Sequence, residues 1–259
     1  MTTATLLPPT ARRPGPKSWL SLMGAEAKMV TRDTSGLIIP LGLPLLILVM
    51  SAAPASQEVI VNGRTALDLF VLPLVLTVII ATIGIINMPS FLAYYRRSGI
   101  LRRLAVTPVS PAMVLVAQVV VSLLQTVLGL TLALAVAFWG FGANPPVHLW
   151  AAVGIFLLAL SAMYALGMMV AAIAPTPNSA VAIGLVLFFA FGALGGLFGG
   201  VQMLPDALAP LADWLPFGAA VQALGSAWAG VALDLTYLIS LVTTAVIGTG
   251  VAICLFRWE

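Results

Sequence analysis

Side chains that could do covalent or metal chemistry are scarce in this sequence. His148 is its only histidine and Cys254 its only cysteine. A serine or cysteine nucleophile needs a base within reach, and a metal site needs several His, Cys or carboxylate ligands together. No phosphate loop of the form GxxxxGK followed by Ser or Thr occurs. The sequence therefore predicts no catalytic residue, no metal site and no nucleotide site on this chain.

Positive charge is concentrated in the stretch YYRRSGILRRLAVTPVSP, residues 94–111. Gly99 interrupts it, and Leu101 and Leu104 place apolar side chains on one face of a short helix. The Thr107-Pro108 pair is typical of a helix end. A short amphipathic helix of this kind would suit the docking of a partner. The alternative is that its arginines only anchor the bilayer edge and set orientation. These are Arg96, Arg97, Arg102 and Arg103.

A second candidate feature is a polar line formed by Gln118, Ser122 and Gln125. Offsets of four and three residues put the three side chains on one face of a helix. Glutamines within hydrocarbon face protein or a cavity. The line therefore either borders a substrate path or bonds a neighbouring helix.

A third feature is the glycine spacing of Gly192, Gly196 and Gly200. Small residues every four positions allow two helices within lipid to approach closely. This spacing favours a seam between two copies of the chain or, equally, packing within one chain.

The composition identifies the kind of protein that must position these residues. The chain has 259 residues, of which 61% are hydrophobic and 7% charged, and its mean hydropathy is +1.14. A soluble domain is about half apolar and about a quarter charged. These values exclude a soluble enzyme, a disordered chain and a disulfide scaffold, and predict an all-α integral membrane protein.

Six apolar stretches are long enough to cross a bilayer, which takes roughly 20 residues. The first contains Pro40 and Pro44, so we expect it to be kinked. Residues 1–36 precede it as a cytoplasmic arm, and residues 37–256 form one transmembrane domain. The predicted spans are about 37–53, 69–93, 111–141, 147–174, 178–200 and 235–256.

The basic residues give this topology an orientation. If the six spans alternate, ten of the eleven lysines and arginines fall on one side, and only Arg64 falls on the other. The positive-inside rule then places both termini in the cytoplasm. Charges are absent from the span centres, and Asp68 is expected in solvent at an outer edge. The sequence therefore offers no titratable group for ion-coupled transport.

The stretch 201–233 is predicted outside the cell yet is largely apolar, with three prolines spaced through it. A freely solvated loop would be more polar. We therefore expect short re-entrant helices there, with a loop packed over the end of the bundle as the alternative.

The motif in residues 94–111 resembles the segment between spans two and three of type-2 permeases of ATP-binding-cassette (ABC) exporters. The subtype it most resembles is the actinobacterial, daunorubicin-resistance-like group of drug and antibiotic exporters. Many family members carry an acidic residue at the position of Arg97, so no ion pair is carried over from it. The residues that carry the resemblance are Arg96, Gly99, Ile100, Leu101, Arg102, Arg103, Leu104, Thr107 and Pro108.

The resemblance implies a fold and an assembly. Family members have six spans, an amphipathic interfacial helix before the first, and re-entrant helices between spans five and six. In this chain the amphipathic helix corresponds to residues 19–30, where Glu26 and Lys28 are expected away from the apolar face. Residues 94–110 would be the cytoplasmic segment that couples the permease to its ATPase.

The resemblance also implies partners and a function. Two cytoplasmic ABC ATPase subunits would hold ATP and magnesium, and a second permease, identical or paralogous, would complete the pathway in the cell membrane. The chain itself would hold no cofactor and bind no nucleic acid. The expected function is export of a hydrophobic or amphipathic substrate such as a drug, an antibiotic or a lipid-like molecule. The alternatives are a permease for polysaccharide or cell-wall precursors and a membrane scaffold that transports nothing.

Overall fold

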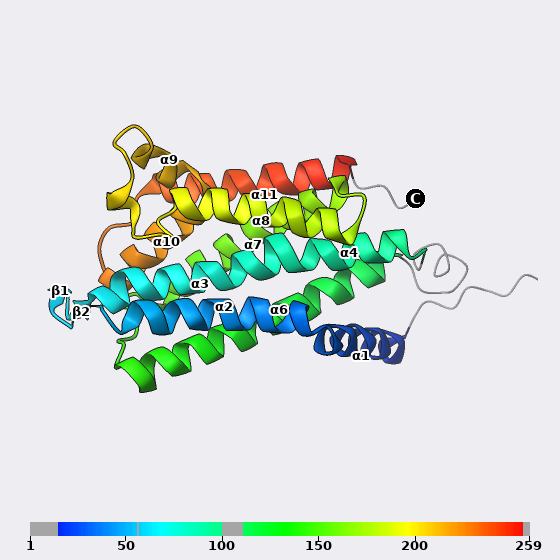
Figure 1. The fold of residues 1–259 in the computed structure, drawn as a ribbon, viewed down its shortest axis with the longest axis horizontal. Helices are drawn as coiled ribbons and strands as arrows, with labels where there is room; N and C mark the ends of the chain where they lie inside the picture. Colours follow the sequence, from blue (N-terminus) through cyan, green and yellow to red (C-terminus); the bar gives the residue numbers. More distant parts are fainter. Residues whose placement is uncertain (1–14, 56, 100–110, 256–259) are drawn as a thin grey trace, which may run out of the picture.

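The computed structural model describes residues 15–55, 57–99 and 111–255, and these form an elongated bundle of helices (Figure 1). Four segments in sequence, η1, α3, η2 and α4, follow one another without interruption as one helix from Leu67 to Arg97. Their bounds are η1 Leu67–Val71, α3 Leu72–Ala81, η2 Thr82–Asn87 and α4 Met88–Arg97. The other long helices are α1 Pro16–Arg32, α2 Thr34–Ala52, α6 Pro111–Ala135, α7 Leu149–Ile173, α8 Pro177–Leu194 and α11 Leu235–Leu255.

The lengths of these helices agree with a protein that crosses a membrane several times. Within the described residues five helices are long and apolar enough to span, and the pair α1 and α2 supplies a sixth candidate that is bent by 63°. Pro40 and Pro44 both lie inside α2, and the sharp bend falls before them, between the two helices. The span predicted over 178–200 is corrected, because α8 ends at Leu194.

The Leu67–Arg97 helix is the centre of the bundle. It is the most apolar and the most buried of the candidate spans, which is the pattern expected of a central helix. The helices α2, α6, α7, α8 and α10 (Pro216–Ala229) all pack against it. Gly167 of α7 and Gly184 of α8 allow the closest approaches. A Cβ on Gly184 would lie 2.5 Å from the carbonyl oxygen of Ile85, and Gly167 has even less room beside Gly84.

The region predicted to be re-entrant does contain short helices. These are η4 (Val201–Met203), α9 (Ala209–Trp214) and α10. α10 is almost completely buried and packs against η1, α3, α7 and α11. The two ends of the bundle therefore differ (Figure 1). One, called here the hairpin end, carries β1 (Val59–Val61), β2 (Arg64–Thr65), α9 and α10, and the other, the α1 end, carries α1 and the last turns of α4, α7 and α11.

The β1–β2 hairpin was not predicted, although its Asn-Gly turn is a strong sequence signal. Asn62 and Gly63 have φ values of 49° and 73°, the left-handed values that a two-residue hairpin turn requires. The hairpin leads directly into η1 and brings Thr65 to the carboxylate of Asp68.

Asp68 is fully buried, which corrects the expectation that it would be solvated. Its carboxylate accepts hydrogen bonds from the backbone N–H of Thr65 at 3.0 Å and from the backbone N–H and side-chain amide of Asn144 at 2.7 and 2.9 Å. The indole N–H of Trp228 donates to the carbonyl oxygen of Asn144 at 3.1 Å. Asp68 therefore joins the central helix, the segment between α6 and α7, and α10 at the hairpin end, because a buried carboxylate must have such partners.

Candidate functional site

Tyr95, at the α1 end of the central helix, contacts the amphipathic helix. Its hydroxyl donates to the carboxylate of Glu26 at 2.5 Å, and both side chains are buried. Val114 of α6 packs beside the Tyr95 ring, as do Leu22 and Met29 of α1. The bond therefore joins α1 to α4 at a contact that also includes α6.

Glu26 lies on the apolar face of α1, which corrects its predicted position. It follows Leu22 by four residues and precedes Val30 by four, and these offsets define one face of a helix. Burial raises the pKa of the Glu26 carboxyl above its usual range, and the hydrogen bond from Tyr95 partly opposes that increase. Lys28 is exposed, as predicted.

Arg96 binds its own chain. Its guanidinium donates to the carbonyl oxygens of Ala172, at 3.4 Å, and Ala174. These carbonyls lie at the C-terminal end of α7, where unpaired oxygens carry partial negative charge. Arg97 is exposed instead, and Gly99, two residues after the end of α4, has a φ of 69°. The other residues predicted to couple to an ATPase lie outside the described residues, namely Leu101, Arg102, Arg103, Leu104, Thr107 and Pro108.

The polar line of α6 faces the protein and lines none of the cavities described below. Gln118, Ser122 and Gln125 are all buried. Gln125 donates to the carbonyl oxygen of Gly36 at 2.7 Å and accepts from Asn87 at 3.1 Å. Ser122 bonds the hydroxyl of Tyr164 in α7. For these two residues the arrangement is the second predicted alternative, a bond to a neighbouring helix.

A proline explains why Gly36 needs these partners. The carbonyl of Gly36 would normally accept the N–H of residue 40, but Pro40 has none. Asn87 and Gln125 both donate to it, at 2.9 and 2.7 Å. A backbone carbonyl in hydrocarbon must be satisfied by protein. These amides therefore satisfy the carbonyl that Pro40 leaves free, and they join α2 to η2 and α6.

The prediction that three spaced glycines form a seam on one helix is corrected for two of them. Gly196 and Gly200 lie beyond the end of α8, in a turn where their φ values are 91° and 90°. Gly192 is within α8 and buried, and Leu197 of the same chain folds against it, 2.9 Å from where a Cβ would lie. The spacing therefore serves a tight turn, because such φ values favour glycine. Whether this region meets a second copy stays a prediction.

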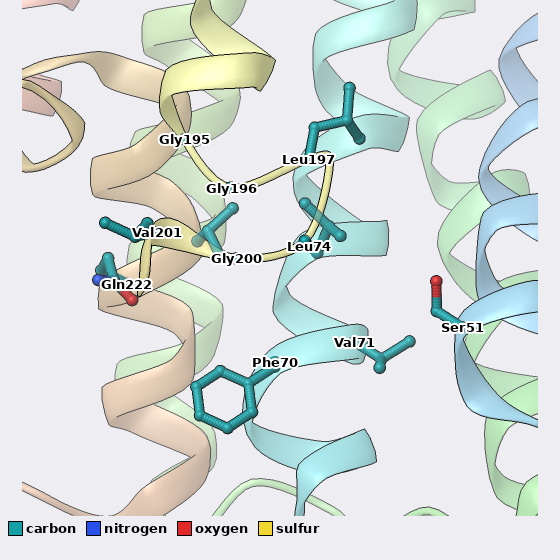
Figure 2. Close-up of a pocket in the computed structure, with 12 residues that line it drawn as sticks. Ser51, Phe70, Val71, Leu74, Gly195, Gly196, Leu197, Gly200, Val201 and Gln222 are labelled. Atoms are coloured by element: carbon teal, nitrogen blue, oxygen red, sulfur yellow. The ribbon is translucent and has the colours of Figure 1, made fainter. Parts of the chain in front are cut away.

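The glycine turn borders a cavity of about 390 Å³ at the hairpin end (Figure 2). α2 contributes Ser51 and α10 contributes Gln222, the two polar side chains of its lining. The central helix supplies apolar side chains, and the turn supplies mostly backbone. This hairpin-end cavity is lined by Ser51, Phe70, Val71, Leu74, Val221, Gln222 and residues 195–197 and 199–201.

A smaller cavity of about 150 Å³ lies among α2, the central helix and α8, toward the α1 end. Its lining is more polar, with Asn87, Thr82 and Ser90 beside apolar Ile39 and Val181. Asp33 also reaches it, and its carboxylate accepts the N–H of Gly36 at 3.1 Å as the N-cap of α2. The two cavities thus share α2 and the central helix, which they border at different depths.

Several of these residues were missed, although their signals are present in the sequence. Asn87 is an uncharged polar residue within an otherwise apolar run, and Glu26 interrupts the apolar face of α1. A polar group at such a position must find a partner within the protein. The sequence indicates that a partner exists, whereas the structure identifies it.

Replacing Gln125 with leucine should destabilise the fold mainly through Gly36. We expect Gln125→Leu to lower the free energy of unfolding by about 1 kcal/mol, in the range measured for bonds between membrane helices. In a Pro40→Ala background the backbone N–H of residue 40 can serve the same carbonyl, so the effect of Gln125→Leu should shrink. Thermal unfolding in detergent of the two single variants and the double variant measures this coupling. Equal effects in both backgrounds would contradict the assignment.

The raised pKa of Glu26 predicts a pH dependence of stability. The folded protein holds this proton more tightly than the unfolded chain, whose carboxyl has the ordinary pKa of 4.5. The contribution of Glu26 to the free energy of unfolding is therefore complete below pH 4.5. It decreases as the pH rises through the raised pKa of the folded protein. Glu26→Gln should remove this dependence from the melting temperature, whereas Glu58→Gln, at an exposed position, should retain it. An unchanged pH profile in Glu26→Gln would disprove the prediction.

Comparison with known proteins assigns the family. Residues 17–228 match the ABC-2 type transporter family, a stretch that begins in α1 and ends in α10. No curated protein matches the chain. The family match covers most of the sequence and includes the central helix, both cavities and the contact between Glu26 and Tyr95. The chain therefore belongs to the ABC-2 type transporter family, as a multi-pass membrane component of an ABC transporter.

Proposed function

We propose that this chain is the permease subunit of an ATP-driven exporter for hydrophobic or amphipathic substrates such as drugs, antibiotics or lipid-like molecules. The transporter family works with separate ABC ATPase subunits, and this chain lacks a phosphate loop of its own. Two ATPase subunits in the cytoplasm would bind ATP and magnesium. A second permease, identical or paralogous, would complete the pathway.

The contacts at the end of α4 carry this proposal. The last residues of α4, from Tyr94, are the start of the predicted docking segment, residues 94–110. Within this first part of the segment Tyr95 is bonded to α1, and Arg96 to the end of α7. A displacement applied to the segment would therefore move α4, α1 and α7 together. This is what a transporter needs in order to convert ATP binding outside the membrane into rearrangement of helices within it.

The two cavities support the proposed substrate class. Both border α2 and the central helix. The hairpin-end cavity is mainly apolar with two hydrogen-bonding side chains, and the smaller cavity combines apolar and hydrogen-bonding side chains. Such a lining suits a molecule with a large apolar body and few polar groups. We place the transport path on this side of the bundle, between two permeases. The basic residues of the arm and the docking segment put the α1 end in the cytoplasm, so release would be at the hairpin end.

Reversing charge in the docking segment should uncouple the ATPase. We expect Arg102→Glu combined with Arg103→Glu to reduce the ATP turnover of the assembled transporter to that of its ATPase subunits alone, because the docking contact is lost. Turnover is measured in proteoliposomes that contain the permease and its ATPase. The control is Lys17→Glu combined with Lys28→Glu, which makes the same change of charge at exposed positions of α1. Full turnover in the arginine variant, with normal insertion, would refute the role of this segment.

A further inference from the structure

A second large cavity lies on the opposite face of α3, between α6 and α7. Its volume is about 360 Å³ and its lining is apolar throughout, apart from the backbone. α6 contributes Leu130 and Leu134, the helix η3 (Val136–Gly140) that follows it contributes Phe138, and α7 contributes Ala152 and Phe156. The floor is formed by Leu76 of α3 together with Leu224 and Trp228 of α10. We call this cavity the α6–α7 groove.

The groove exists because α6 and α7 diverge. In the described residues these consecutive helices barely pack against each other, although both pack against the central helix. α6 runs obliquely to α2 and α3 (Figure 1). Pro145 and Pro146, in the connection between the two helices, close the groove toward the hairpin end.

The groove is separate from the proposed transport path. Leu74 lines the hairpin-end cavity and Leu76 lines the groove. Two positions in sequence are about 200° apart around an α-helix, so these side chains leave opposite faces of α3. The central helix therefore stands between the two cavities.

We propose that the α6–α7 groove binds one acyl chain of a membrane lipid. The groove follows α6 and η3 from Val127 to Phe138, a length of about 17 Å at about 1.5 Å per residue. Half of a bilayer's hydrocarbon core is about 15 Å thick. The groove thus has the depth of one leaflet, the one nearer the hairpin end.

Two tryptophans fix the level of the groove in the bilayer. Trp139, beside the end of α6, and Trp150, at the start of α7, are 89% and 84% exposed. Tryptophan at such positions lies at the boundary between lipid headgroups and hydrocarbon. The groove descends from this level, and its rim continues into the exposed side chains of Val127, Val153 and Leu157. It is thus continuous with the surface that the surrounding lipid covers.

Other occupants fit the groove less well. Water needs several polar partners to occupy a cavity, and apolar cavities of this kind stay dry and accept apolar ligands. A helix from a second protein is about 10–12 Å across with its side chains, which is too wide for a volume of about 360 Å³. A single flexible hydrocarbon chain fits this volume and makes apolar contacts with the lining.

Photolabelling tests the proposal directly. The full chain would be reconstituted in vesicles of phosphatidylcholine and phosphatidylglycerol with a phosphatidylcholine that carries a diazirine in one acyl chain. Mass spectrometry then locates the labelled residues. We expect label on Leu224 and Trp228, which are buried in the protein and can be reached only from within the groove. Label on exposed Val246 of α11 reports ordinary lipid contact. Label on Val246 without any on the floor residues would overturn the proposal.

Filling the groove provides a matched comparison. Ala152→Phe places a ring within it, and Val153→Trp covers its rim from an exposed position that the fold does not depend on. Either variant should lose label at Leu224 and Trp228 and keep it at Val246, whereas Val246→Phe should leave the floor labelled. Unchanged floor labelling in the rim variant would contradict the proposal. So would disulfide formation between copies of V153C in a C254S background, since the occupant would then be protein.

Discussion

The burial of the Leu67–Arg97 helix is the constraint on which the rest of the structure depends. Five other helices pack against it, and a helix so enclosed in a membrane protein has no water to satisfy its polar groups. Its threonine and serine hydroxyls bond carbonyl oxygens of the same helix, whereas its larger polar side chains find partners on other elements. Asp68 does so with Asn144, Asn87 with Gly36 and Gln125, and Tyr95 with Glu26.

These bonds lie at three levels along the central helix. At the hairpin end Asp68 and Asn144 connect it to α10 through Trp228. At the middle level Asn87 connects it to the first turn of α2 and to α6. At the α1 end its last residues connect it to α1 and α7. The central helix is thus bonded to its neighbours at each of these three levels, so its motion is coupled to theirs. This is the property that the proposed transport mechanism uses.

Composition and periodicity were sufficient to predict the class of fold and most of its spans. In lipid, the backbone N–H and C=O groups of a long apolar run find hydrogen-bond partners when the run forms a helix. The bounds of α6, α7 and α11 therefore lie close to the predicted ones. The motif around Arg96 and Gly99 indicated the family before the family comparison confirmed it. Both inferences rest on local pattern, which a single sequence contains.

Tertiary partners were harder to predict, and the errors share a physical cause. Periodicity shows that Gly196 and Gly200 are four residues apart, but not that the helix ends before them. It shows Asp68 near a span end, but not the hairpin and Asn144 that bury it. The free carbonyl of Gly36 could have been deduced from Pro40, whereas the amides that bind it come from two distant helices. Such contacts depend on the packing of the whole bundle.

The central claim is that α1 and α4 move as one body when ATP drives the transporter. The most direct test is the distance between spin labels at Lys28 of α1 and Tyr94 of α4, both exposed, measured by electron paramagnetic resonance in a C254S background. We expect this distance to stay constant when ATP binds the assembled transporter, while the distance between the Lys28 labels of two permeases changes. A change of the Lys28–Tyr94 distance within one permease would contradict the account.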